Sequence, residues 1–203
     1  MNFGWIPSLV MYILGITLIG FTFKTYLRKT RPSSKERLDE MLQEEHKAQY
    51  TRSVPLPENQ LLQVDFTKYP KVEHIECEKK YQALMHYAQL SMVNLKGQTN
   101  LELKKMYGAQ TLELIGQYEK NYYAFMDTAI QYGKTLYENG YLAEARQTLE
   151  HCLNYHCDVS KCYIMLIEIY KLQNDFHALD KLKTIAQVEM CQSPFLHKVL
   201  NMI

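Results

Sequence analysis

The first 23 residues of the chain contain no charged side chain, and this feature most restricts how the chain can fold. From Trp5 to Phe23 the residues are nearly all apolar. The hydrocarbon core of a bilayer is about 30 Å thick, and a helix needs about 20 apolar residues to cross it. The sequence therefore predicts a transmembrane helix over residues 1–23, in contact with the lipid bilayer.

Two other interpretations of residues 1–23 are a cleaved signal peptide and a buried core helix. A signal peptide needs a basic start and small residues at its cleavage site. The segment from Phe21 to Arg31 is instead bulky and basic where that site would lie. A core helix at the surface of a globular domain needs a polar face, which this run lacks. A single membrane span therefore remains the prediction.

The orientation of the span is predicted by the basic residues that follow it. These residues are Lys24, Arg28, Lys29, Arg31, Lys35 and Arg37. Basic residues beside a membrane span stay on the cytoplasmic side. We therefore expect the N-terminus outside and the long remainder of the chain in the cytoplasm. The five cysteines, an odd number, are typical of free thiols in a reducing compartment.

The rest of the chain is expected to be all-α. Only 8 glycines and 6 prolines interrupt 203 residues, which favours helix over sheet. Residues 24–75 are expected to form a basic flank, stalk and lead-in. A short helix there starts near Ser33, which has capping-box spacing with Glu36, and runs to about Tyr50. Apolar residues at helical spacing predict a helical domain over residues 76–203. The expected helices are 76–97, 100–118, 121–139, 142–153, 160–172 and 175–190, with a short one near the C-terminus.

One part of the helical domain repeats after 34 residues. Ala129, Leu136, Gly140 and Leu142 correspond to Tyr163, Tyr170, Asn174 and Phe176. This period is that of the tetratricopeptide repeat. The segment Tyr132–Ala145 resembles that family, because Gly133, Gly140 and Ala145 occur in the family's order.

The resemblance implies stacked antiparallel helix pairs, with the best-matching repeats at about 126–157 and 160–190. It places Gly133 opposite Ala145, where the two helices of a pair come closest, and Gly140 in the turn between them. The second repeat departs from the family at Ile167 and Leu179, which replace the glycine and the alanine. An unrelated helical bundle is the alternative.

A partner-binding face follows from the same resemblance, because the concave face of such arrays binds a peptide or partner segment. The repeat register nominates Lys134, Tyr137, Lys161, Ile164 and Lys171. The lysines would engage an acidic segment or a C-terminal carboxylate, and the other two would supply apolar contact. The alternative is an ordinary solvated helix face.

The segment His151–Cys162 contains three cysteines and two histidines, which are zinc-ligand types. Its cysteines are spaced Cys–x4–Cys–x4–Cys, which lacks the closely spaced pair of a zinc knuckle. No phosphate-binding loop or catalytic motif is present in the sequence. We therefore expect no metal, no cofactor, no catalytic residues and no enzymatic activity.

The net charge of +1 gives no overall field for nucleic acid, so none is expected as a partner. Taken together, these features predict a membrane-tethered adaptor or scaffold that binds a protein partner in the cytoplasm. Two alternatives are open: a metal- or thiol-dependent enzyme or sensor built on His151–Cys162, and a structural subunit of a membrane complex.

Overall fold

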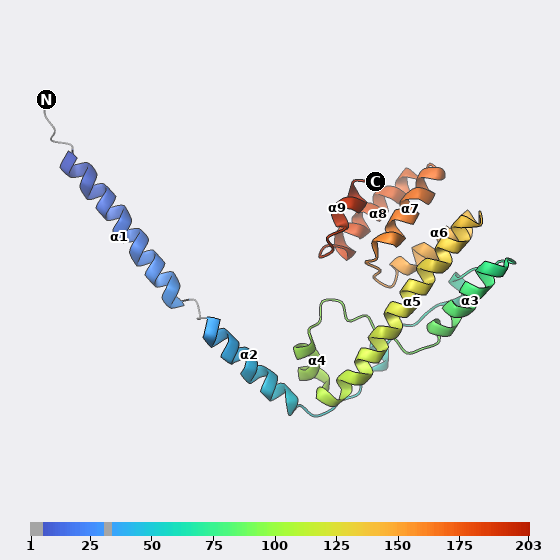
Figure 1. The fold of residues 1–203 in the computed structure, drawn as a ribbon, viewed down its shortest axis with the longest axis horizontal. Helices are drawn as coiled ribbons and strands as arrows, with labels where there is room; N and C mark the ends of the chain where they lie inside the picture. The colour runs from blue at the N-terminus through green and yellow to red at the C-terminus, as the bar shows by residue number, and fades with distance from the viewer. Residues whose placement is uncertain (1–5, 31–33) are drawn as a thin grey trace. The chain divides into compact units, whose positions relative to one another are not determined.

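The computed structural model describes residues 6–30 and 34–203, without the side chains of residues 6–9 and 27–30. All regular secondary structure in the described residues is helical (Figure 1), which confirms the all-α class. The chain divides into two units, residues 1–51 and 52–203.

The first unit contains α1 (Ile6–Thr30) and α2 (Ser34–Gln49). The side chains of residues 10–26 are all exposed, although most of them are apolar. Helix α2 confirms the short helix expected up to about Tyr50. Trp5, Arg31 and Ser33 lie outside the described residues.

Residues 6–23 of the predicted membrane span lie in α1, and residues 1–5 lie outside the described residues. Within the part of the chain that the structure describes, no helix is long and apolar enough to cross a membrane. The transmembrane helix is therefore not confirmed and stays a prediction.

The second unit contains seven α-helices and three short 3-10 helices. The α-helices are α3 (Ile75–Ala88), α4 (Asn100–Tyr107), α5 (Leu112–Glu138), α6 (Leu142–Leu153), α7 (Ser160–Leu172), α8 (Phe176–Glu189) and α9 (Leu196–Leu200). The 3-10 helices are η1 (Glu58–Gln60), η2 (Phe66–Lys68) and η3 (Ala109–Thr111).

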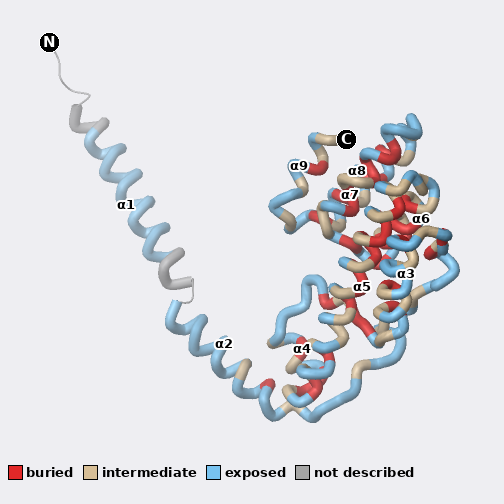
Figure 2. The backbone as a smooth tube through the Cα atoms, turned by 45° about the vertical axis from the view of Figure 1, so that its right-hand side comes forward, coloured by how far each residue is buried: buried red, intermediate tan, exposed pale blue. Residues whose placement is uncertain are grey.

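Helix α5 is the central element of the second unit, because it packs against both α3 and α6 (Figure 1). Its buried apolar side chains belong to the main core, except Ile115, which belongs to a second, smaller cluster. Those in the main core include Tyr122, Phe125, Met126, Ala129, Ile130, Tyr132 and Leu136. Figure 2 shows this buried stripe running along α5 and into the helices that pack on it.

Three expected helix boundaries are wrong: the ends of the first two helices, which backbone geometry explains, and the start of the third. The helix expected over 76–97 ends at Ala88, and the following segment is held in a non-helical form by backbone bonds such as Leu62 N–H to the Met92 carbonyl, 2.8 Å. The helix expected over 100–118 ends at Tyr107, because Gly108 adopts φ 79°, which favours glycine. Helix α5 then runs unbroken through the expected gap between 118 and 121.

Gly133 makes a close contact between α5 and α6. A Cβ atom built on Gly133 would lie 2.8 Å from both Cγ and Cδ2 of Leu149, which is fully buried. Leu149, one helical turn beyond Ala145, supplies the three atoms nearest to that position. The atoms nearest to Gly133 therefore belong to Leu149, and the pairing of Gly133 with Ala145 stays a prediction.

Each helix pair contains a turn between its two helices, α5–α6 in the first pair and α7–α8 in the second. The two turns have the same geometry and lie 34 residues apart. Gly140 has φ 84° and Asn174 has φ 54°. At the first turn, the Tyr141 N–H donates to the Leu136 carbonyl at 2.9 Å, and the Gly140 N–H donates to Tyr137 at 3.1 Å. The second turn repeats both bonds, from Asp175 to Tyr170 at 2.9 Å and from Asn174 to Lys171 at 3.2 Å. Both turns are Schellman motifs, which satisfy the last carbonyls of α5 and α7.

The segment before α3, which the sequence assigned to a lead-in, belongs to the second unit. Three tyrosine hydroxyls bind its backbone or side chains. Tyr107 donates to Gln60 Oε1 at 2.6 Å, Tyr155 accepts from the Asp65 N–H at 3.2 Å, and Tyr132 donates to the Pro70 carbonyl. Tyr69 itself is only 3% exposed and lies in the main core.

The close contact at Gly133 predicts opposite effects for two substitutions in the same helix. Gly133→Ala adds a methyl group against buried Leu149, so overpacking of about 1–3 kcal/mol should exceed the helix-propensity gain of about 1 kcal/mol. Gly116→Ala is the matched control, because no atom lies within 4 Å of its new Cβ, and it should stabilise the chain. Denaturant unfolding of both variants would measure this. Equal stabilisation by both would contradict the close contact.

Candidate functional site

The residues nominated for partner binding lie on α5 and α7, the first helices of the two pairs. Lys134 and Lys161 are exposed. The Lys134 ammonium lies 3.4 Å from Glu138 Oε1, one turn further along α5, and both side chains are more than half exposed. Such a pair contributes little to stability and leaves the lysine available to a partner.

The other three nominated residues make contacts within the chain. Tyr137 and Ile164 are half-buried and pack against the main core. The Lys171 ammonium donates to the backbone carbonyl of Met202, beyond α9. The exposed lysines Lys134 and Lys161 are thus the members of the nominated set most open to a partner.

The cysteines of the His151–Cys162 segment are buried in the main core. Cys152, Cys157 and Cys162 have exposed fractions of 1% or less. The Cys152 thiol donates to the Thr148 carbonyl at 3.4 Å and the Cys162 thiol to the Leu149 carbonyl at 3.6 Å. Among the described residues, no group of three or more His, Cys, Asp or Glu side chains is placed to hold a metal ion.

The surroundings of these three cysteines favour the neutral thiol of Cys162. Hydrogen bonding with Cys152 and Cys157, followed by burial, raises the pKa of the Cys162 thiol well above its usual value. A nucleophilic or metal-binding cysteine needs the opposite shift, toward the thiolate. The cluster therefore has the properties of buried structural thiols.

His151 is buried beside these thiols with both ring nitrogens engaged. Nε2 lies 2.8 Å from the Tyr155 hydroxyl, and Nδ1 lies 3.2 Å from Asn154 Nδ2. The Tyr69 ring meets the imidazole edge-on, with centroids 5.0 Å apart. Burial lowers the pKa of His151, against the attraction of Asp65, which raises it.

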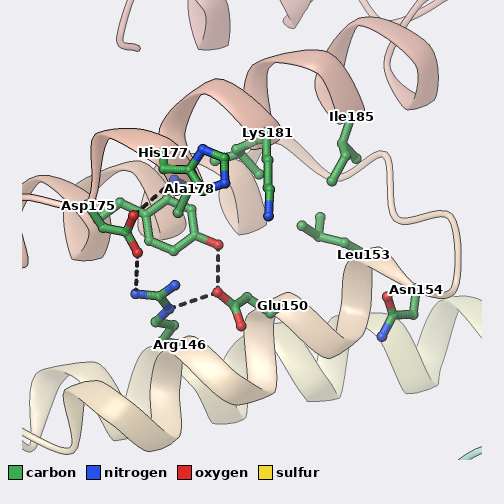
Figure 3. A pocket seen from close by; sticks show the side chains of 11 residues that line it. Arg146, Glu150, Leu153, Asn154, Asp175, His177, Ala178, Lys181 and Ile185 are labelled. Atoms are coloured by element: carbon green, nitrogen blue, oxygen red, sulfur yellow. Dashed lines mark hydrogen bonds and ion pairs between the residues drawn. The ribbon is translucent and has the colours of Figure 1, made fainter.

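A groove of about 290 Å³ lies between α6 and α8 and was not nominated from the sequence (Figure 3). Helix α6 contributes Arg146, Glu150 and Leu153, followed by Asn154, and α7 contributes Tyr170. Asp175 and the α8 residues His177, Ala178, Lys181, Leu182 and Ile185 complete the lining.

Arg146 organises one end of the groove. Its Nε lies 2.8 Å from Glu150 Oε1, and one terminal nitrogen lies 2.9 Å from Asp175 Oδ2. The guanidinium carbon also lies 4.7 Å from the centroid of the Tyr170 ring, whose hydroxyl donates to Glu150 at 2.9 Å. This combination of charge pairs and ring stacking fixes the side chain of Arg146.

The other end of the groove is lined by two apolar side chains and one lysine. Leu153 and Ile185 line it from the two facing helices. Figure 3 shows the Lys181 side chain reaching from α8 into the space between them. Among the described residues, no carboxylate lies within ion-pairing distance of the Lys181 ammonium.

The sequence contained only partial signals for this groove. Arg146 and Glu150 are four residues apart, which predicts a helix-surface pair. Asp175 follows a turn residue and caps α8 by accepting from the Ala178 N–H at 3.0 Å. Neither signal shows that Arg146 reaches Asp175, because that contact depends on how α6 packs beside α8.

Comparison of the chain with protein-family models, with curated proteins and with solved structures finds no match.

His151 should make the stability of the chain depend on pH. Because burial lowers its pKa in the folded state, the unfolded chain binds more protons below about pH 6.5, the ordinary histidine value. The stabilisation is present above that pH and is lost as pH falls toward the folded-state pKa. Each kcal/mol lost lowers Tm by about 2–4 °C in a domain of this size.

Thermal melts at pH 7.5 and pH 5.5 would measure this loss. The drop in Tm should be smaller in the His151→Gln variant than in the wild type. The control is His177→Gln, at an exposed position on α8. An unchanged drop in His151→Gln would show that other groups cause the acid sensitivity.

Proposed function

We propose that this chain is a non-enzymatic adaptor, tethered to a membrane by its N-terminal segment, that binds a protein partner in the cytoplasm. The observation that carries the proposal is the 34-residue repetition of the Schellman turns at Gly140 and Asn174. Helices α5 and α7 end, and α6 and α8 begin, at the same spacing. This supports two tetratricopeptide-like pairs at about 126–157 and 160–190, an architecture whose use is the presentation of a binding face.

The membrane tether is proposed from the sequence of residues 1–23 and from the exposure of α1. Apolar side chains such as Ile13, Leu18 and Phe21 are more than half exposed, and they need an apolar environment. A lipid bilayer supplies that environment, and the basic residues from Lys24 onward favour the cytoplasmic side for the remainder.

The alternative of a thiol- or metal-dependent enzyme is less well supported. Cys152, Cys157 and Cys162 are buried, and the pKa of Cys162 is raised. A structural subunit of a membrane complex remains a variant of the proposal, in which the partner is an integral part of that complex.

Thiol labelling tests the proposed topology, because Cys191 is exposed while the other four cysteines are buried. An impermeant maleimide applied to intact cells should leave the chain unlabelled, and lysis should expose one reactive thiol. Denaturation should raise the number to five. Labelling of Cys191 in intact cells would contradict the cytoplasmic location.

Charge reversal tests the proposed binding face. Lys134→Glu with Lys161→Glu should reduce crosslinked recovery of a protein partner from native membranes by about tenfold or more, because both lysines are exposed on the first helices. The matched control is Lys120→Glu with Lys183→Glu, two exposed lysines outside the nominated set.

Recovery should also weaken as salt rises, because exposed charges are screened within about 8 Å at physiological ionic strength. If both double variants recover the same partners as the wild type, the face formed by α5 and α7 is not the binding site.

A further inference from the structure

We propose that the groove between α6 and α8 is a second binding site, which takes a short acidic peptide segment with an apolar side chain beside its carboxylate. The groove is separate from the proposed binding face, since its charged side chains come from the second helices of the pairs and from the turn at Asp175. The inference does not depend on that face.

The expected charge of the ligand depends on which charged groups of the groove already have partners within the protein. Glu150 Oε1 accepts from Arg146 and from the Tyr170 hydroxyl. Asp175 uses one oxygen for Arg146 and the other for the Ala178 N–H. These carboxylates are therefore held by the protein itself, and Arg146 is held by them.

Lys181 differs from Arg146, because its ammonium reaches into the groove without an ion-pair partner among the described residues. His177 lies one turn before it on α8 and also lines the groove (Figure 3). An ammonium and an imidazole together can donate to a single carboxylate. The open polar groups of α8 thus match an acidic ligand.

The apolar part of the ligand is fixed by the side chains beyond Lys181. Leu153 on α6 faces Ile185 on α8, and both are half-buried rather than closed off by a neighbour. A branched apolar side chain placed between them would remove their remaining exposed surface from water.

The size of the groove indicates a short segment. Ligand pockets usually measure about 300–1,000 Å³, so a volume of about 290 Å³ lies at the lower end. Such a space suits a few residues of an extended or turn-forming peptide better than the face of a whole helix. The occupant is therefore a short linear segment of a partner protein.

The test measures binding of a fluorescein-labelled peptide of alternating leucine and aspartate to the full-length chain in detergent micelles. Its analogue with asparagine in place of aspartate controls for apolar and detergent effects. The acidic peptide should bind the wild type at least about fivefold more tightly than the analogue. Lys181→Glu should weaken the acidic peptide about tenfold, which corresponds to about 1.4 kcal/mol.

The matched control is Lys183→Glu, which makes the same charge change on the same helix at an exposed position outside the groove lining. It should change the affinity by less than about twofold, and thermal melts should show that both variants remain folded. Equal affinity for the two peptides, equal weakening by the two variants, or no measurable binding would each overturn the proposal.

The results can also distinguish this proposal from the proposed binding face on α5 and α7. If Lys134→Glu with Lys161→Glu abolishes peptide binding and Lys181→Glu does not, the acidic peptide binds α5 and α7, and the groove proposal is overturned. If Lys181→Glu alone acts, the groove proposal holds whatever the result at the other face.

Discussion

The contact between Gly133 and Leu149 is the constraint on which the helical array depends. Because Gly133 has no side chain, α6 can bring a fully buried leucine against the backbone of α5. The turn at Gly140, with its positive φ, then has to return the chain within a few residues. With α6 fixed in this way, one of its faces packs on α5 while its neighbouring surface packs on α7.

Tyrosine hydroxyls provide the second means of holding the fold together. The segment from Arg52 to His74 contains only two short 3-10 helices, so few of its polar groups can be satisfied locally. Tyr107, Tyr132 and Tyr155 each have a buried ring whose hydroxyl bonds to this segment. Each ring adds apolar area to the core, while its hydroxyl forms a hydrogen bond with a polar group of this segment.

The same packing divides the titratable side chains into buried groups and exposed groups. Groups inside the core, such as the Cys162 thiol and the His151 imidazole, are shifted toward their neutral forms by their surroundings. The exposed charged groups of the helix pairs are of both signs and include Lys134, Asp127 and Glu168. The buried groups are therefore held neutral, and the charge of these helices lies at their surface.

The sequence by itself determined the all-α class, the short helix before Tyr50 and the bounds of α6, α7 and α8 to within a residue or two. These features depend on local periodicity and on turn residues such as Gly140 and Asn174. Tertiary structure decided that α5 continues unbroken and that the atoms nearest to Gly133 belong to Leu149. It also decided the groove, where Arg146, Tyr170 and Asp175 come from separate parts of the chain. Local propensity is summed over a few neighbouring residues, whereas these contacts exist only once α5, α6, α7 and α8 have packed and buried their apolar faces.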